Sequence, residues 1–458
     1  MVNSYVDRYL GSGDKLSLAR SIYAEMSKFP IISPHGHVEA NMILENKNFT
    51  DPVSLLITPD HYILRMLRSQ GISYDDLAVN SPEANFQLLA DNWRLFRSTP
   101  SRIWFQEILA TLFGVSEILN SKNASKIYGL IAEQLARPDL KPQALFKRFN
   151  IEVLATTDTT SDPLTSHIDL AKLDLGGRII PTFRPDDVSD PSWADWKSNL
   201  AKLEQSHGVE IKSFANLLTA LRAARDHFKS CGATATDHGV ISARTLKLSP
   251  KECEALFAEV SSAAASQKAI EDFRAVMLYE HAVMASQDGL VMQLHPGSLR
   301  NYDSQTFAKY GPDKGFDIPV QTTYVRELQP LLNDLGSHPN FRLVIFTLDE
   351  STYSRELAPL AGAYSSIRLG PPWWFLDSLN GLERWREAIT ETAGYYNTVG
   401  FIDDTRAFCS IPVRHDVARR FDSSYLAREV IRGRITENEA IELAADLAYN
   451  LSKEFFNL

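Results

Sequence analysis

Two histidines separated by one residue are the part of this sequence best suited to chemistry. His35 and His37 follow the short apolar run Phe-Pro-Ile-Ile at 29–32. On an extended segment, side chains at i and i+2 point to the same side of the backbone, so both imidazoles can reach one ion. The pair predicts a site for a single divalent metal, with zinc preferred over manganese, iron, nickel or cobalt. The alternative is a pair of buried histidines that only fill the core.

Asp404 is the candidate for a third ligand. In an extended segment Ile402, Asp404 and Arg406 share one face, and Asp403 points to the other. Asp404 can then approach the metal or act as a base, with Arg406 on the same side. The structural alternative is an Asp404–Arg406 ion pair that caps a helix. No lysine ends the fourth predicted strand, so we expect one metal rather than two metals bridged by a carbamylated lysine.

Strand-like segments that alternate with helical patterns must position these residues. Several of the segments are short and continuously apolar, which is typical of parallel strands buried on both faces. Eight strands alternating with helices indicate a (β/α)8 barrel of the TIM type. No Gly-x-Gly-x-x-Gly motif opens a helix after any of them, which counts against a dinucleotide-binding fold. The segments are 30–33, 151–156, 178–183, 232–236, 289–294, 342–347, 365–369 and 398–402.

The gap between the first two segments is too long for one barrel helix. Residues 58–140 have helical periodicity almost throughout, which predicts a helical insertion between strand 1 and strand 2. We expect residues 1–57 to form an N-terminal helix and the first strand, 58–145 the insertion, and 146–458 the remainder of the barrel. A second long helical region is predicted at 249–287.

Every predicted strand is followed by charged, imidazole-bearing or aromatic residues. In barrel enzymes the C-terminal ends of the strands carry the chemistry. Each residue alone can be explained as a helix N-cap, but their presence at all the strand ends favours an active site. They are His35 and His37, Thr157-Asp158, Arg184-Pro185-Asp186, Asp237-His238, His295, Asp349-Glu350, Trp373-Trp374 and Asp403-Asp404-Thr405-Arg406.

The composition indicates a soluble globular protein from a reducing compartment. A net charge of −10 argues against a nucleic-acid partner, because phosphate binding needs a basic face. The three cysteines have no paired spacing. The polar start of the sequence is unlike a secretory signal, and no apolar run approaches the roughly 20 residues of a membrane helix. We therefore expect a cytoplasmic protein without nucleic-acid or membrane partners.

These motifs, taken together and in order, resemble those of the uronate isomerases (glucuronate isomerases), a branch of the amidohydrolase superfamily. The similarity extends over nearly the whole chain. The matching segments are Asp60-His61-Tyr62, Thr156-Thr157-Asp158, Pro181-Thr182-Phe183-Arg184-Pro185-Asp186, Asp237-His238-Gly239, Met292-Gln293-Leu294-His295, Leu299-Arg300-Asn301, Trp373-Trp374-Phe375, Asp404-x-Arg406-x-Phe408 and Arg414-His415.

The resemblance implies an enzyme that interconverts an aldohexuronate and its 2-keto isomer. The pair would be D-glucuronate and D-fructuronate, or D-galacturonate and D-tagaturonate. The reaction would move the C2 proton through an enediolate, assisted by one metal on His35, His37 and Asp404. Asp404 would be the base, Tyr62 the partner acid, and Arg406 would share the negative charge of the enediolate.

The resemblance also implies the residues that bind the substrate. Arg184 and His61 would hold the C6 carboxylate, because a guanidinium group matches a carboxylate with two parallel hydrogen bonds. Arg300 and Arg414 would add positive charge in an otherwise acidic protein. Their alternative is pairing with nearby carboxylates at the surface.

Two aromatic residues and a histidine complete the expected substrate site. Trp373 and Trp374 would pack against the carbon face of the sugar, or alternatively fill the barrel. His295 would lie over the sugar hydroxyls or orient a neighbouring side chain. We further expect a homo-oligomer, as is common for large barrels of this kind.

Several positions depart from the usual family pattern and imply a divergent subgroup. Gly36 stands where cysteine is usual, Pro371-Pro372 precede the tryptophan pair, Asp349-Glu350 replace an asparagine-containing segment, and Asp403 replaces a threonine. The choice between glucuronate and galacturonate stays open, since it depends on the placement of a few hydroxyl partners. The alternatives in function are a metal-dependent hydrolase or lyase of the same superfamily, and a catalytically silent protein that binds sugar acids.

Overall fold

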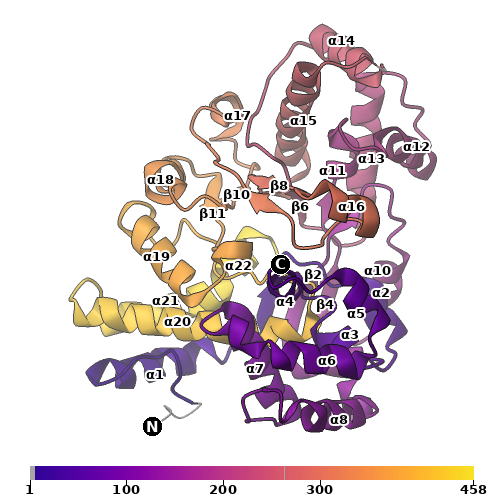
Figure 1. The fold of residues 1–458 in the computed structure, drawn as a ribbon. Coiled ribbons are helices and arrows are strands. Elements are labelled where there is room, and N and C mark those ends of the chain that lie inside the picture. The colour runs from indigo at the N-terminus through magenta and orange to yellow at the C-terminus, as the bar shows by residue number, and fades with distance from the viewer. Residues whose placement is uncertain (1–5, 263) are drawn as a thin grey trace.

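A barrel of parallel strands forms the centre of the molecule, as the computed structural model of residues 6–262 and 264–458 shows (Figure 1). Its strands are short and most of their residues are buried, which fits apolar segments such as 343–345. They are β1 (Ile31–Ser33), β2 (Ile151–Ala155), β3 (Asp158–Thr159), β4 (Arg178–Ile180), β5 (Phe183–Arg184), β6 (Ala235–His238), β7 (Val291–Leu294), β10 (Leu343–Ile345) and β11 (Ile367–Leu369).

The strands follow one another around the barrel in chain order. β1 pairs with β2 and β2 with β4, while β3, β5, β6, β7, β10 and β11 continue the parallel pairing. The segment of β2 and β3 stays beside that of β4 and β5, because the Thr156 N–H donates to the Ile180 carbonyl at 2.9 Å. The predicted (β/α)8 barrel is therefore confirmed.

Four predicted strands differ clearly from the observed ones. The second and third are each divided in two, so that Asp158 lies in β3 and Arg184 in β5. The fourth runs from Ala235 to His238, so Asp237 and His238 belong to the strand itself instead of following it. The eighth, expected at 398–402, is reduced to an isolated parallel bridge between Leu369 and Thr398. Gly400 has a φ of 74°, and Asp404 a φ of 41°, and such positive values end an extended segment.

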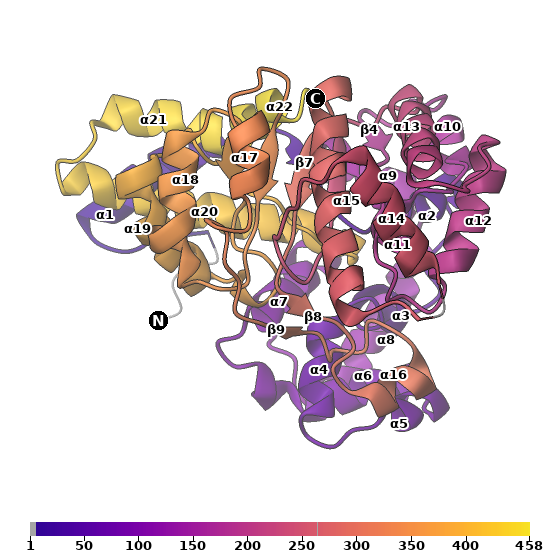
Figure 2. The same ribbon diagram turned by 90° about the horizontal axis from the view of Figure 1, so that it is seen from above.

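Helices that follow the strands cover the outside of the barrel (Figure 2). They pack on it through apolar side chains such as Phe228 of α13 and Phe273 of α15. They are α10 (Thr165–Leu170), α11 (Asp186–Ser189), α12 (Trp196–His207), α13 (Phe214–Ser230), α14 (Pro250–Ser261), α15 (Gln267–Asp288), α17 (Gln329–Leu335), η3 (Tyr353–Leu357), α18 (Ala358–Ala363), η4 (Trp374–Leu376), α19 (Leu379–Ala393), η5 (Phe408–Ser410) and α20 (Ile411–Ile431).

The two ends of the chain pack together beside α20. The N-terminal helix α1 (Asp14–Met26) contacts α20 and α21 through Ala19, Ile22 and Met26. The C-terminal elements are α21 (Glu437–Ala445), η6 (Asp446–Asn450) and α22 (Leu451–Phe455).

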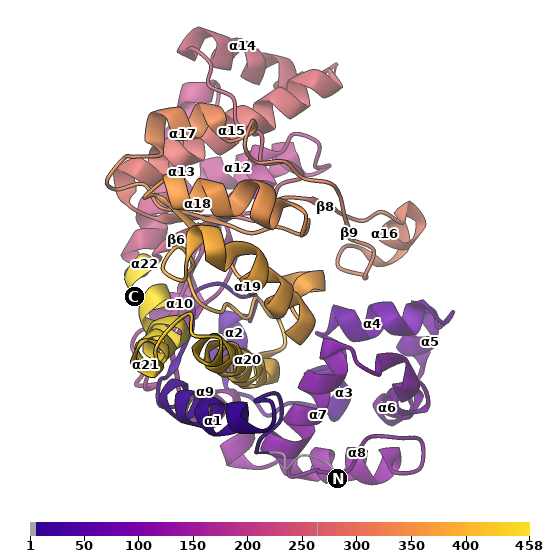
Figure 3. The ribbon, with the colours of Figure 1, turned by 90° about the vertical axis from the view of Figure 1, so that its left-hand side faces the viewer.

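Residues 34–150, between β1 and β2, contain helices and loops. Figure 3 shows α3 to α8 gathered on one side of the barrel. They are α2 (Ala40–Glu45), α3 (Pro52–Leu56), α4 (His61–Arg68), α5 (Tyr74–Val79), α6 (Pro82–Asp91), η1 (Trp93–Phe96), α7 (Pro100–Phe113), α8 (Ala124–Leu135), η2 (Pro138–Leu140) and α9 (Pro142–Arg148). The expected domain boundaries at 57/58 and 145/146 stay a prediction.

A hairpin arm projects on the same side (Figure 3). It consists of the antiparallel strands β8 (Ser298–Leu299) and β9 (Ile318–Pro319) with α16 (Ser304–Tyr310) between them. The Tyr74 hydroxyl of α5 donates to the Lys314 carbonyl at 2.7 Å, which fastens the arm to the helices of residues 34–150. Among the helices that the structure describes, none combines the length and the apolar character needed to cross a membrane.

Candidate active site

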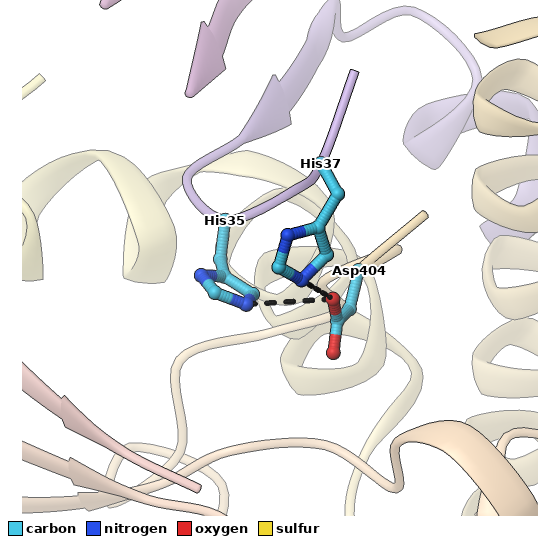
Figure 4. Close-up of side chains that lie close together, drawn as sticks. All are labelled: His35, His37 and Asp404. Atoms are coloured by element: carbon cyan, nitrogen blue, oxygen red, sulfur yellow. Dashed lines mark ion pairs between the residues drawn. The ribbon is translucent and has the colours of Figure 1, made fainter. Parts of the chain in front are cut away.

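His35, His37 and Asp404 converge at the C-terminal end of the barrel (Figure 4). Nε2 of His37 lies 3.1 Å from Oδ1 of Asp404, and Nε2 of His35 lies 3.4 Å from the same oxygen. The two histidines come from the loop after β1, and Asp404 comes from the segment after the bridge at Thr398. The structure thus brings the three predicted metal ligands together.

Backbone and hydroxyl hydrogen bonds fix the two loops that carry this group. The His37 N–H donates to the Thr405 carbonyl at 3.0 Å, which ties the first loop to the last. The Thr157 hydroxyl donates to the Gly36 carbonyl at 2.8 Å, between the two histidines. These bonds between loops hold the two imidazoles in place. The sequence had indicated only that side chains at i and i+2 of an extended segment share one side.

The donor set of this group fits a divalent metal. Its ligand atoms lie within 4.8 Å of one another, and two imidazole nitrogens with one carboxylate oxygen are ligands that zinc and related ions accept. Burial opposes charge on Asp404, but His35 and His37 hold the pKa of its carboxyl well below the usual range. Asp404 is therefore ionised, as a metal ligand must be. The three side chains form a group able to hold a metal ion.

His35 is in turn contacted by a second pair of polar residues, His295 and Asp237. Nδ1 of His295 is 2.7 Å from Oδ1 of Asp237, and the His295 ring stacks on the His35 ring with centroids 4.6 Å apart. Nε2 of His295 is buried and has no hydrogen-bond partner among the described residues. Burial lowers the pKa of His295, although Asp237 opposes this effect, so the ring stays neutral at pH 7. Asp237 therefore holds the His295 ring in place, and the two roles expected of His295 stay predictions.

Arg184 is clamped by two carboxylates at the ends of β5 and β6. Its Nε donates to Asp186 at 2.7 Å, and its Nη1 lies 3.0 Å from Asp237. Burial opposes the charge of Arg184, but Asp237 and Asp186 raise its pKa above the ordinary value. A Cβ on Gly239 would lie 2.2 Å from Nη2 of Arg184, so only glycine leaves room for the guanidinium. This close approach explains the glycine that follows Asp237-His238.

His61 and Tyr62 reach the site from the first turn of α4. Asp60 caps this helix, since its Oδ1 accepts from the Tyr62 N–H at 2.9 Å. The His61 and Tyr62 rings stack with centroids 4.6 Å apart, and Trp374 meets His61 edge-on. Burial lowers the pKa of His61 to about 3 and raises that of Tyr62. At pH 7 the imidazole is therefore neutral and the phenol is protonated.

Arg300 lies in the hairpin arm, and Arg406 reaches the arm from the segment after the last bridge. Nη1 of Arg406 donates to Asp313 at 2.8 Å, and Nη1 of Arg300 donates to Asp317 at 3.0 Å. The Arg300 guanidinium also lies over Trp374, 5.0 Å from a ring centroid. Both arginines are thus paired with carboxylates of the arm, and no sequence pattern indicates Asp313 or Asp317 as their partners.

One large cavity of about 1470 Å³ connects these residues. Of the residues expected to bind the metal, to catalyse or to bind the substrate, all but His35 and His295 line it, and these two lie buried against Asp404 and Asp237. The strand-end residues Asp158, His238, Asp349 and Glu350 do not line it. The lining residues from the expected set are His37, His61, Tyr62, Arg184, Arg300, Trp373, Trp374, Asp404, Arg406 and Arg414. The structure thereby assembles residues from the barrel, from α4 and from the hairpin arm.

Comparisons with known proteins agree with this arrangement. Residues 5–456 match the family model described as glucuronate isomerase. The chain is 49% identical over 451 residues to the uronate isomerase of Rhizobium meliloti (strain 1021), with 96% of each chain covered. It is 48% identical over 450 residues to the uronate isomerase of Brucella suis (strain ATCC 23445 / NCTC 10510), again with 96% of each covered.

Solved structures give the same result. The glucuronate isomerase of Caulobacter crescentus superimposes with a TM-score of 0.97 at 45% identity, covering 98% of this chain and 96% of that one. The uronate isomerase of Thermotoga maritima superimposes with a TM-score of 0.95 at 27% identity, and both chains are covered completely, at 100%. The chain therefore belongs to the glucuronate isomerase family, which confirms the resemblance recognised in its motifs.

Proposed function

We propose that this protein interconverts an aldohexuronate and its 2-keto isomer by proton transfer through an enediolate. The substrate is D-glucuronate, D-galacturonate or both. The observation that carries the proposal is the Asp404 carboxylate, which stands beside His35 and His37 in a cavity that also contains Tyr62 and Arg184. The cavity thus contains a base and an acid for the proton transfers. It also contains a cation that can bind the carboxylate of a small sugar acid.

His35, His37 and Asp404 would hold one divalent ion, with zinc as our first choice. When bound, such an ion supplies Lewis acidity to the O1 and O2 oxygens of the open-chain sugar. Removing it with a chelator should abolish turnover, and adding zinc, manganese, iron, nickel or cobalt in turn should identify the ion that restores it.

The side chains of this protein divide the proton transfers between them. Asp404 takes the proton from C2 and returns it to C1, which needs an ionised carboxylate at the start. Tyr62 donates its phenolic proton to O1 and recovers one from O2, which needs a phenol that is protonated at pH 7. Arg406 shares the negative charge of the enediolate through the part of its guanidinium that is not paired with Asp313, since only its Nη1 donates to that carboxylate.

Arg184 and His61 bind the C6 carboxylate of the uronate. Arg184 already has two edges occupied by Asp186 and Asp237, so its Nη2 beside Gly239 is the group left for the substrate. This placement explains how a protein with a net charge of −10 binds an anion, since the clamped guanidinium supplies a local positive charge. Trp373 and Trp374 border the same cavity and pack against the carbon face of the sugar.

Incubation of the metal-loaded protein with each uronate tests this function. Carbon NMR should show the C2 ketone of D-fructuronate from D-glucuronate, or that of D-tagaturonate from D-galacturonate. If the metal-loaded protein leaves both uronates unchanged, the proposed function is wrong.

A further inference from the structure

Both hydrogen bonds of Arg414 that the structure shows go to other residues of the protein. Arg414 lies in the first turn of α20, and its side chain is only 3% exposed. Its Nη1 donates to the Asp403 carbonyl at 2.7 Å and to Oδ2 of Asp377 at 3.1 Å. One nitrogen of Arg414 therefore joins the segment after the last bridge to the loop after β11.

The face of the Arg414 guanidinium is occupied as well. Its Cζ lies 3.8 Å from the ring centroid of Trp104 in α7 and 5.6 Å from that of Tyr62 in α4. The guanidinium thereby also contacts the helices of residues 34–150. Asp377 is buried, which raises the pKa of its carboxyl to about 7, and the nearby Arg414 opposes this rise.

Asp403, whose carbonyl accepts the hydrogen bond from Arg414, directly precedes Asp404. Asp403 is held twice from α20, since its carbonyl accepts from Arg414 and its Oδ2 lies 3.0 Å from Nε2 of His415. Asp404 itself has a φ of 41°, in the left-handed region that residues other than glycine rarely adopt. Such a conformation persists only where the surrounding structure imposes it. The bonds that hold Asp403 constrain the backbone on the N-terminal side of Asp404.

We propose that Arg414 is a positioning residue that holds the Asp403–Asp404 turn and the Tyr62 ring in register, so that the carboxylate and the phenol face the same substrate. This role rests on the proposed function of the site. The sequence suggested a direct substrate contact for Arg414, which also borders the cavity. The positioning role rests instead on the two bonds of its Nη1 and on its contact with Trp104, while its Nε has no hydrogen-bond partner among the described residues.

Arg386 offers a matched control for Arg414. It is also buried, its guanidinium pairs with Asp422 at 3.1 Å, and it lies over the Trp385 ring at 4.5 Å. It does not line the cavity of the site. Replacing either arginine by methionine therefore removes a buried ion pair and an aromatic contact, but only Arg414→Met should disturb Asp404.

The test compares kcat and KM of Arg414→Met, Arg414→Lys and Arg386→Met with those of the unmodified protein. Misplacing the base should lower kcat of Arg414→Met about 100-fold while KM stays within about threefold. Lysine keeps the charge but not the planar fork, so Arg414→Lys should lose about tenfold in kcat and serves if Arg414→Met does not fold. Arg386→Met should keep kcat within about twofold per folded molecule. A rise in KM as the main change, or a loss in kcat no larger than that of the control, would overturn the proposal.

Zinc affinity gives a second readout that does not need turnover. Loosening the Asp404 turn should weaken zinc binding by about tenfold in Arg414→Met, measured by competition with a chelating dye, and leave Arg386→Met unchanged. Equal zinc affinity in the two variants contradicts the positioning role. A protein that converts no uronate but shows the difference in zinc affinity would instead contradict only the proposed function.

Discussion

Nε2 of His37 lies 3.1 Å from Oδ1 of Asp404, and this contact joins the loop after the first barrel strand to the segment after the last. The same two loops are tied by the backbone bond from His37 to Thr405. The geometry of the site therefore depends on the contact between the first and last loops of the barrel. A substitution in either loop should displace the side chains of the other.

Asp404→Asn should remove the base and weaken the metal group while the fold remains. An amide cannot accept the C2 proton, so turnover should fall by about 1000-fold or more. Steady-state kinetics with zinc in excess check this, and circular dichroism confirms folding. Asp334→Asn, at an exposed carboxylate paired with Lys247, is the control. Turnover near that of the unmodified protein would exclude Asp404 as base.

Arg184→Met should chiefly impair the binding of the uronate carboxylate. The loss of a charged hydrogen-bonding partner should raise KM by about tenfold or more. The same change leaves Asp186 and Asp237 without their buried cation, so the melting temperature should also fall.

Arg225→Met separates the two effects of Arg184→Met. Arg225 is a buried arginine that pairs with Asp288 and does not line the cavity, so its loss should lower stability without a change in KM. An unchanged KM in Arg184→Met would move the carboxylate site elsewhere.

Tyr62→Phe should lower kcat by about 100-fold, because the ring and its packing remain while the acidic proton is lost. Tyr128→Phe, in α8 of the same group of helices, is a control for the loss of a hydroxyl far from the cavity. Full activity of Tyr62→Phe would reduce the role of Tyr62 to packing between His61 and Trp104.

Asp158 should make stability fall as the pH rises. Burial raises the pKa of its carboxyl to about 7 in the folded protein, above the unfolded value, so the folded state binds more protons between about pH 4 and 7. The contribution is fully present at low pH and is lost as the pH rises through about 7. His167 has the opposite effect on the pH dependence of stability. Burial lowers its pKa to about 4, so its contribution to stability rises with pH.

A comparison with Asp158→Asn tests the combined effect of the Asp158 carboxyl and of its contact with His167, whose Nε2 lies 3.8 Å from it. From pH 5 to pH 7.5, the unmodified protein should lose on the order of 2 kcal/mol more unfolding free energy than the variant, measured in urea. Parallel pH dependence in the two proteins would show that Asp158 is ionised already at pH 5.

The sequence predicted the barrel and the convergent residues because both follow from local patterns. Short apolar segments marked the strands, and the His-x-His pair marked His35 and His37. Asp404 was selected by assuming an extended segment at 402–406, whereas the structure brings it to the histidines from a turn. The eighth strand was predicted wrongly, since the positive φ angles of Gly400 and Asp404 come from packing against other parts of the chain.

The partners of the arginines could not be predicted in the same way. Asp313 and Asp317 lie on a hairpin arm whose position depends on its contacts with α5, including the bond from Tyr74 to Lys314. Asp377 and Asp403 meet Arg414 only because the loop after β11 and the start of α20 are folded together. Such pairings join residues far apart in the chain, so periodicity and spacing carry no signal for them.

Proton NMR of the zinc-loaded protein with D-glucuronate, and then D-galacturonate, in heavy water tests the central claim most directly. Proton transfer through Asp404 and an enediolate predicts conversion to the 2-keto acid with deuterium from the solvent at C1, to the extent that the carboxyl exchanges before it returns the proton. In Asp404→Asn both the conversion and the exchange should disappear. Conversion without any deuterium at C1, together with undiminished conversion by Asp404→Asn, would exclude proton transfer through Asp404.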